Sequence, residues 1–146
     1  MSALFEHSPW VETRADARPP SGDRHADLMA VVRDATRDAQ LALIRAHPEL
    51  AGKAAVDGSL TEASAAEQAS AGLDRLTQAE FDRFHALNAA YREKFGFPFI
   101  ICVRLTDKAG ILAAMERRLA NDRDTEIATA IEQISEIVRL RLEDLA

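Results

Sequence analysis

Residues 77–103 read TQAEFDRFHALNAAYREKFGFPFIICV, and this stretch decides the fold class. Thr77, with Glu80 three residues later, forms a capping-box pattern that predicts the start of a helix. The glycine at position 96 predicts the end of that helix. The apolar run at 97–103 has the composition of a short buried strand, but the chain offers no partner strand. Because an isolated strand is not stable, we interpret this run as an extended buried segment between helices.

Helical patterns on both sides of this stretch predict an all-α protein. Apart from the helix that ends near Gly96, the expected helices span about 24–45, 59–71, 107–120 and 124–144. The first of these should stop near Ala46, because the residue before a proline is disfavoured in the α region and His47 precedes Pro48. Turn-forming residues at 14–24 predict a loop. We therefore expect a single domain over residues 1–146, all-α, with roughly six to eight helices and one extended buried segment near 97–103.

The composition of the chain excludes several classes of protein. Its 146 residues are 47% hydrophobic and 29% charged, which suits one soluble globular domain. Glycine (6) and proline (5) are scarce, which argues against β-sandwiches and barrels. A net charge of −6 without a basic run argues against a nucleic-acid partner. With Cys102 as the only cysteine, an intrachain disulfide and a cysteine-based zinc cluster are both excluded.

The sequence also predicts where the protein resides. Its start, MSALFEHSPW, lacks the basic and long apolar regions of a signal peptide. The longest apolar run, Phe97–Val103, is far shorter than the roughly 20 residues of a membrane-spanning helix. We therefore expect a cytoplasmic protein without a membrane partner.

The aromatic residues are unevenly distributed. Six of the eight lie in the stretch quoted above, and the rest of the core must come mainly from aliphatic side chains. We expect Phe81, Phe84 and Tyr91 to pack a helix. Phe97 and Phe99 should anchor the extended segment. The cluster would then support a site rather than supply its chemistry.

His47 is the first candidate for chemistry. Histidine exchanges a proton near neutral pH, and a helix C-terminus favours its charged form. A general acid at this position is therefore physically sensible. The alternative is that His47 only caps carbonyl groups at the end of the helix, and the dipeptide His47–Pro48 alone does not decide between the two.

A polar triplet is the second candidate. At separations of three and four residues, Ser64, Glu67 and Gln68 share one helical face. The alanines around them would let this face approach another element closely. A carboxylate there can orient an imidazole, while the hydroxyl and amide groups hold a polar ligand. The alternative is an ordinary solvated helix face.

The extended segment is the third candidate, within residues 91–104. An extended buried backbone leaves its N–H and C=O groups without helical partners, and these groups can bind a flat, amide-rich ligand. The alternative is a hydrophobic plug between helices. Other signals are weak, because His7, His25 and His85 lack metal-ligand spacing and no glycine-rich phosphate loop is present. A thiol in apolar surroundings, such as that of Cys102, is usually inert.

Taken together and in order, these motifs resemble the family of 2-oxo-4-hydroxy-4-carboxy-5-ureidoimidazoline decarboxylase (OHCU decarboxylase). The matching stretches are AHPELAG at 46–52, LTEASAAEQASAGLD at 60–74, LNAAYREKFGFPFIICVR at 87–104 and EIVRLRLEDL at 136–145. The N-terminal part is less similar, since Arg18-Pro19-Pro20 stands where the family more often has Arg-Pro-aromatic.

The resemblance implies a small, all-helical, cofactor-free enzyme of urate degradation that forms homodimers. It would convert OHCU to (S)-allantoin, with His47 as the proton donor, Glu67 as its catalytic partner and no metal. The implied substrate-binding residues are Pro48, Ser64, Ala65, Ala66, Gln68, Phe99, Ile100, Ile101, Cys102, Val103 and Arg141. The sequence leaves open whether Arg141 or Arg104 contacts the substrate carboxylate.

Two other classes of protein compete with this interpretation. A non-catalytic relative would keep the fold and bind a purine-like or ureide ligand, but it would have no need of both His47 and Glu67. A helical scaffold protein would explain the amphipathic helices but not the polar triplet. Faster decay of OHCU with an optically active product would favour the enzyme.

Overall fold

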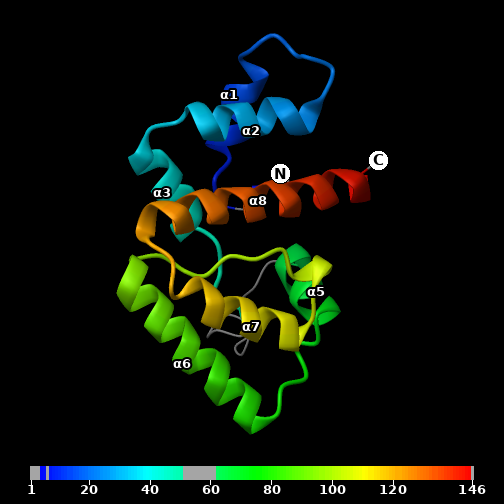
Figure 1. The fold of residues 1–146 in the computed structure, drawn as a ribbon. Coiled ribbons are helices and arrows are strands. Elements are labelled where there is room, and N and C mark those ends of the chain that lie inside the picture. Colours follow the sequence, from blue (N-terminus) through cyan, green and yellow to red (C-terminus); the bar gives the residue numbers. More distant parts are fainter. Residues whose placement is uncertain (1–3, 6, 51–61, 146) are drawn as a thin grey trace.

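The computed structural model describes residues 4–5, 7–50 and 62–145. Within these ranges it contains seven α-helices, one short 3-10 helix and no strand, so the all-α prediction is confirmed (Figure 1). The elements are α1 (Trp10–Asp16), α2 (Arg24–Asp34), α3 (Arg37–Arg45), α5 (Glu62–Ser70), α6 (Gln78–Phe95), η1 (Val103–Leu105), α7 (Lys108–Arg118) and α8 (Arg123–Leu145).

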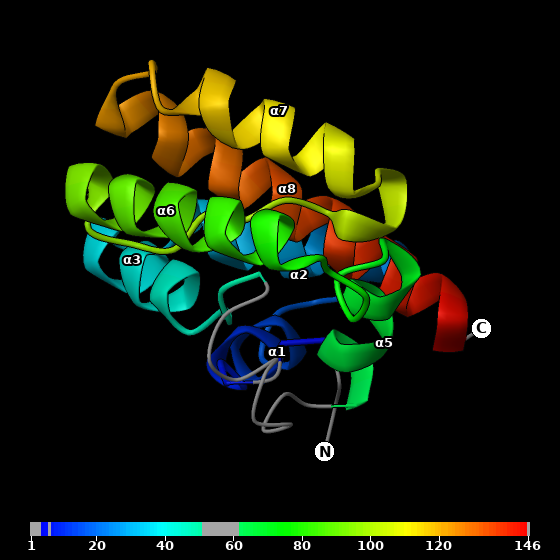
Figure 2. The same ribbon diagram turned by 90° about the horizontal axis from the view of Figure 1, so that it is seen from below.

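Helix α8 is the centre of the fold. Figure 1 shows α1 and α2 on one side of it and α6 and α7 on the other, with α3 packed against α8 near its N-terminal half. In Figure 2 the same arrangement is seen from below, and α5 lies near the C-terminal half of α8. Buried aliphatic residues recur along α8 at helical spacing: Ile127, Ala130, Ile131, Ile134, Ile137 and Val138. These residues form one apolar stripe along α8 and belong to a single buried core with residues of the other helices.

The single helix expected over 24–45 is wrong, because the chain forms α2 and α3 instead. Ala35 leaves the helix with an extended backbone (ψ 159°), and the Thr36 side chain then caps α3 by accepting from the Ala39 N–H at 3.1 Å. The Gln40 side chain donates to the Val32 carbonyl at 3.0 Å and satisfies one carbonyl at the end of α2. No glycine or proline marks this break, and the cap competes successfully with a continuous helix.

The other ends of these helices agree better with the sequence. Helix α3 ends at Arg45, immediately before the expected stop. The loop expected at 14–24 is shorter than predicted, because α1 continues to Asp16. Helix α5 ends one residue before the predicted end at 71. The capping box predicted at Ser59 lies outside the described residues.

Helix α6 follows its sequence signals closely. The Thr77 hydroxyl accepts from the Glu80 N–H at 3.1 Å, and the Glu80 carboxylate accepts from the Thr77 N–H at 2.9 Å. Gly96 ends the helix at φ 79°, a backbone conformation that favours glycine. The chain then runs without regular structure to η1, and most of this segment is buried.

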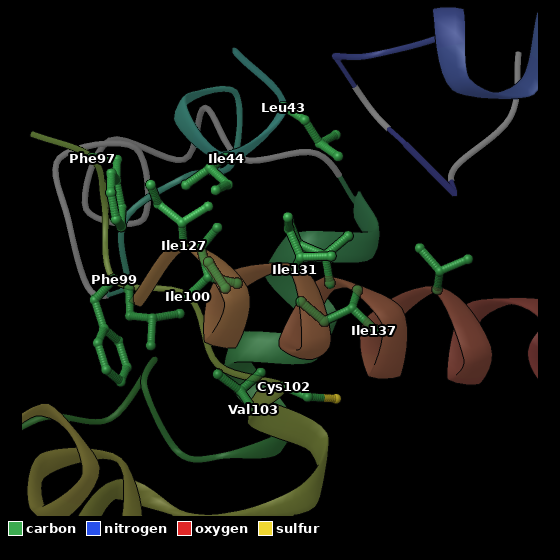
Figure 3. Close-up of a cluster of buried hydrophobic side chains, with 14 of the residues drawn as sticks. Leu43, Ile44, Phe97, Phe99, Ile100, Cys102, Val103, Ile127, Ile131 and Ile137 are labelled. Carbon is green, nitrogen blue, oxygen red and sulfur yellow. The ribbon is translucent and has the colours of Figure 1, made fainter. Parts of the chain in front are cut away.

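The aromatic residues hold the extended segment in place. The Tyr91 ring of α6 meets the Phe99 ring edge-on, with ring centroids 5.3 Å apart, and also meets Phe97 at 5.9 Å. Figure 3 shows Phe97, Phe99 and the aliphatic residues of the segment beside side chains of α3 and α8. The expected anchoring role of Phe97 and Phe99 is confirmed, because both side chains are fully buried.

Candidate active site

A pocket forms where the end of α3, helix α5, the extended segment and α8 meet. Together with the open space at its mouth, the pocket measures about 460 Å³. Its lining residues are His47, Pro48, Leu50, Ser64, Glu67, Gln68, Phe99, Ile100, Ile101, Cys102, Val103, Arg104, Ile137 and Arg141. All three candidate features of the sequence therefore contribute to one cavity.

Two of the expected binding residues lie elsewhere. Ala65 and Ala66 are exposed and do not line this pocket. Ala66 lines an adjoining hollow, next to Arg104 and Asp144. A part for either alanine in binding stays a prediction.

Sequence reasoning missed two apolar lining residues. Leu50 lies within the matching stretch 46–52, which is the signal that could have identified it. Ile137 precedes Arg141 by four residues, so both lie on one face of α8. Arg104 also lines the pocket. The sequence indicates it only as an alternative to Arg141 for contacting the substrate carboxylate.

His47 lies immediately beyond the C-terminus of α3 and is half-buried. Its Nδ1 lies 2.9 Å from the carbonyl oxygen of Leu43. Since a carbonyl only accepts hydrogen bonds, Nδ1 carries the hydrogen, and Nε2 is the nitrogen that can gain and lose a proton. The carbonyl groups at the end of α3 also favour the imidazolium form.

Glu67 and Arg141 form a two-pronged ion pair within the pocket. Arg141 Nε donates to Glu67 Oε2 at 2.8 Å, and Arg141 Nη2 donates to Oε1 at 2.6 Å. Only 8% of the Arg141 side chain and 13% of the Glu67 side chain are exposed. This parallel geometry fixes both groups in orientation as well as position. The predicted pairing of Glu67 with His47 stays a prediction.

The polar triplet on α5 faces inward. Ser64 and Gln68 are both buried, and the Gln68 amide donates to the Glu49 carbonyl at 3.4 Å. Their burial contradicts the alternative of a solvated helix face. The hydroxyl and amide groups are thus placed in the wall of the pocket, where they can contact a polar ligand.

A second ion pair lies at the edge of the pocket. Arg104 donates twice to Asp144 in the last turn of α8, at 2.7 and 3.2 Å. These hydrogen bonds raise the pKa of the Arg104 guanidinium. The pair connects η1 to the C-terminal end of α8.

Cys102 supplies an apolar part of the wall. Its side chain is buried, and this burial raises the pKa of the thiol above its ordinary value. The negative charge of Glu67 acts in the same direction. The thiol is therefore protonated near neutral pH, in agreement with the inert role expected from its surroundings.

Two features are absent from the described ranges. No group of three or more His, Cys, Asp or Glu residues is arranged there to hold a metal ion. No helix in those ranges is both long enough and apolar enough to span a bilayer.

Comparison with known proteins adds independent evidence. The family model described as OHCU decarboxylase matches residues 1–143. The 2-oxo-4-hydroxy-4-carboxy-5-ureidoimidazoline decarboxylase of Haloferax volcanii is 44% identical over 142 residues, covering 95% of this chain and 82% of that protein. The enzyme of the same name from Mus musculus is 40% identical, covering 88% of this chain and 73% of that protein.

Solved structures agree with these matches. A crystal structure of (S)-allantoin synthase superposes with a TM-score of 0.70 and 31% identity, covering 97% of this chain and 46% of that one. A crystal structure of OHCU decarboxylase in the presence of (S)-allantoin shares the fold, with a TM-score of 0.72, 22% identity and coverage of 94% and 91%. From the family match and the relatives at 40% and 44% identity, the chain belongs to the OHCU decarboxylase family.

Proposed function

We propose that this chain carries out the reaction of its family with His47 as the proton donor, converting OHCU to (S)-allantoin in urate degradation. One observation carries the assignment of His47. Its ring is oriented by the Leu43 carbonyl and lines the pocket that also contains Glu67 and Arg141. An oriented imidazole, a carboxylate and a guanidinium in one cavity suit an anionic substrate that must be protonated.

The substrate itself accounts for the loss of carbon dioxide. OHCU carries a carboxylate and a hydroxyl on one ring carbon, beside a C=N bond. When the bond to the carboxylate breaks, its electron pair forms a C=C bond, and the former C=N electrons move to nitrogen, which takes up a proton. An electron sink within the substrate replaces the one that a cofactor supplies to other decarboxylases. The step therefore requires no metal, pyridoxal or thiamine.

His47 then determines the handedness of the product. Loss of carbon dioxide leaves an enol, and the ring carbon that bears the ureido group must gain a proton while the enol hydroxyl loses one. Delivery from Nε2 of a fixed imidazole places the proton on one face only. Without the enzyme both faces are protonated and the product is racemic.

Glu67 and Arg141 prepare the site for this step. Glu67 is the catalytic partner that favours the protonated imidazole through its negative charge. Its two hydrogen bonds to Arg141 hold that guanidinium in the wall of the pocket, where Arg141 binds the substrate carboxylate. Arg104 is the alternative ligand, and it too pairs with a carboxylate, that of Asp144 at the edge of the cavity.

The remaining pocket residues bind the flat part of the substrate. Pro48, Phe99 and the apolar residues that follow enclose the ring. The ureido and ring amides pair with the buried Ser64 and Gln68 side chains and with backbone groups of the extended segment.

Two broader expectations belong to the same proposal. We expect a homodimer, which light scattering during size-exclusion chromatography would measure. We also expect a cytoplasmic location, which fractionation of cells that express the full chain would check.

The experiment generates OHCU in situ from urate and follows both its decay and the circular dichroism of the product. The wild-type protein should accelerate the decay and yield optically active allantoin. His47→Ala should fold normally and slow the catalysed reaction by about 10²–10⁴-fold, leaving a racemic product. His85→Ala, at an exposed histidine of α6, is the matched control. Wild-type rates in His47→Ala would contradict the proton-donor assignment, and unchanged decay with the wild-type protein would indicate a binding module.

A further inference from the structure

Two backbone groups of the extended segment are already engaged within the protein. The Cys102 N–H donates to Oε1 of Gln133, on α8, at 2.9 Å. The Ile100 carbonyl accepts from Nη1 of Arg118, on α7, at 2.7 Å. Neither group is therefore available to a ligand unless it breaks a hydrogen bond with the protein.

These two hydrogen bonds determine the direction of the groups between them. In a planar trans peptide the C=O and the N–H point in opposite directions, and no described peptide bond is cis. The Ile101 N–H shares its peptide group with the Ile100 carbonyl, so it points away from Arg118. The Ile101 carbonyl shares its peptide group with the Cys102 N–H, so it points away from Gln133.

Ile101 differs from its neighbours in accessibility. Phe99, Ile100, Cys102 and Val103 are buried, whereas Ile101 is half-buried and lines the pocket. Among the described residues, no hydrogen bond involves the Ile101 backbone. One N–H donor and one C=O acceptor are thus left together on a strand-like edge, an arrangement that is complementary to an amide.

We propose that Gln133 is a positioning residue that, together with Arg118, aims the N–H and C=O of Ile101 at an amide group of the substrate. This inference rests on the proposed function, since OHCU carries its amides in the ureido group and the ring. Gln133 does not line the pocket and acts only through the backbone of Cys102.

Arg118 is the more firmly held of the two positioning residues. Its Nε donates to Glu126 at 2.8 Å, and its guanidinium lies over the Phe99 ring, 4.3 Å from the ring centroid. Both the arginine and the carboxylate are almost fully buried, so changing either one also affects folding. Gln133 is half-buried and makes its contact through one amide oxygen, so it is the better position for a test.

The test compares three glutamine variants in the OHCU assay. Gln133→Met keeps the length of the side chain and removes the strong acceptor. It should raise KM about 2- to 10-fold, the equivalent of one lost hydrogen bond, and lower the optical purity of the allantoin. Gln133→Glu keeps an acceptor oxygen at the same reach and should restore KM to within about twofold of wild type. Gln40→Met is the matched control, because Gln40 is also half-buried and also hydrogen-bonds the backbone, at the Val32 and Arg33 carbonyls away from the pocket.

A titration of the wild-type protein tests the same point without a variant. With (S)-allantoin as the probe, the Ile101 amide resonance should shift in a nitrogen–proton correlation spectrum, and the Cys102 amide should shift less. A Cys102 shift larger than that of Ile101 would overturn the inference. So would an unchanged KM and optical purity in Gln133→Met, or equal losses in Gln133→Met and Gln40→Met. If the wild-type protein leaves OHCU decay unchanged, the proposed function fails, and the titration alone decides the role of Ile101.

Discussion

Among the arginine–carboxylate pairs of helix α8, two are buried; they are alike in chemistry and differ in surroundings. Near its start, Glu126 accepts from Arg118 of α7, with 0% and 6% of the two side chains exposed. Near its end, Arg141 donates to Glu67 of α5, with 8% and 13% exposed. Burial alone therefore does not distinguish the pair that we assign to the active site from the other.

The difference lies in what else each pair contacts. Both Glu126 oxygens accept from protein groups, since the Tyr91 hydroxyl donates to Oε1 at 2.6 Å and the Asn121 amide donates to Oε2 at 2.9 Å. Burial and the bond to Glu126 raise the pKa of Tyr91, so the phenol stays a donor. The Glu67–Arg141 pair instead lines a pocket. Loss of one partner from a charge pair enclosed by protein leaves the other charge buried and destabilises the fold, whereas a pair at a cavity can exchange a partner for a ligand.

The enclosed pair should contribute most to stability. Glu126→Gln keeps the shape of the side chain and removes its charge, which leaves the Arg118 guanidinium buried without a counter-charge. We expect the free energy of unfolding to fall by about 3–5 kcal/mol, measured by urea denaturation. Glu67→Gln should cost less, about 1–2 kcal/mol, because solvent in the pocket can hydrate Arg141. Equal losses of unfolding free energy in the two variants would show that solvent in the pocket does not compensate Arg141 for the missing negative charge.

The pocket pair should contribute most to activity. Under the proposed function, Glu67→Gln removes the negative charge assigned to favour the imidazolium of His47, and it loosens the hold on Arg141. We expect kcat/KM for OHCU to fall about 100-fold or more, which corresponds to at least about 2.7 kcal/mol of transition-state stabilisation. The fall should be accompanied by a loss of optical purity. Glu132→Gln, at an exposed carboxylate of α8 that pairs with Arg33, is the control, and a similar fall there would remove the special role of Glu67.

Local signals in the sequence were sufficient for much of the fold. The cap at Thr77 and the left-handed Gly96 lie within a few residues of the helix ends they determine, so short-range chemistry predicts α6 correctly. The break between α2 and α3 was not predicted, because Thr36 caps a new helix inside an apolar pattern that continues through both helices. Apolar periodicity reports which face is buried, but it does not report where one helix stops and the next begins.

The candidate site was only partly predictable, because its contacts join distant parts of the chain. Glu67 and Arg141 are 74 residues apart, and no local pattern indicates that they pair. Their place in the pocket was expected from a family resemblance, and the geometry adds the ion pair. The contact of Gln133 with the extended segment was not predicted, because one glutamine on a long amphipathic helix has no sequence signature. Only the fold places its amide beside the Cys102 N–H.

The smallest expected effect of the Glu67 charge is on the reactivity of the Cys102 thiol. Burial, and after it the negative charge of Glu67, raises the pKa of this thiol, so the reactive thiolate is scarce at mildly alkaline pH. Iodoacetamide should therefore modify Cys102 more slowly than free cysteine, as measured by mass spectrometry, and the rate should rise as the pH approaches the raised pKa. Glu67→Gln removes one cause of the shift, so the thiol should ionise at lower pH and react modestly faster than in the wild-type protein. An unchanged rate in folded Glu67→Gln would mean that the positive charge of Arg141 balances the charge of Glu67 at the Cys102 thiol. The electrostatic influence of Glu67 would then be confined to the groups that it touches.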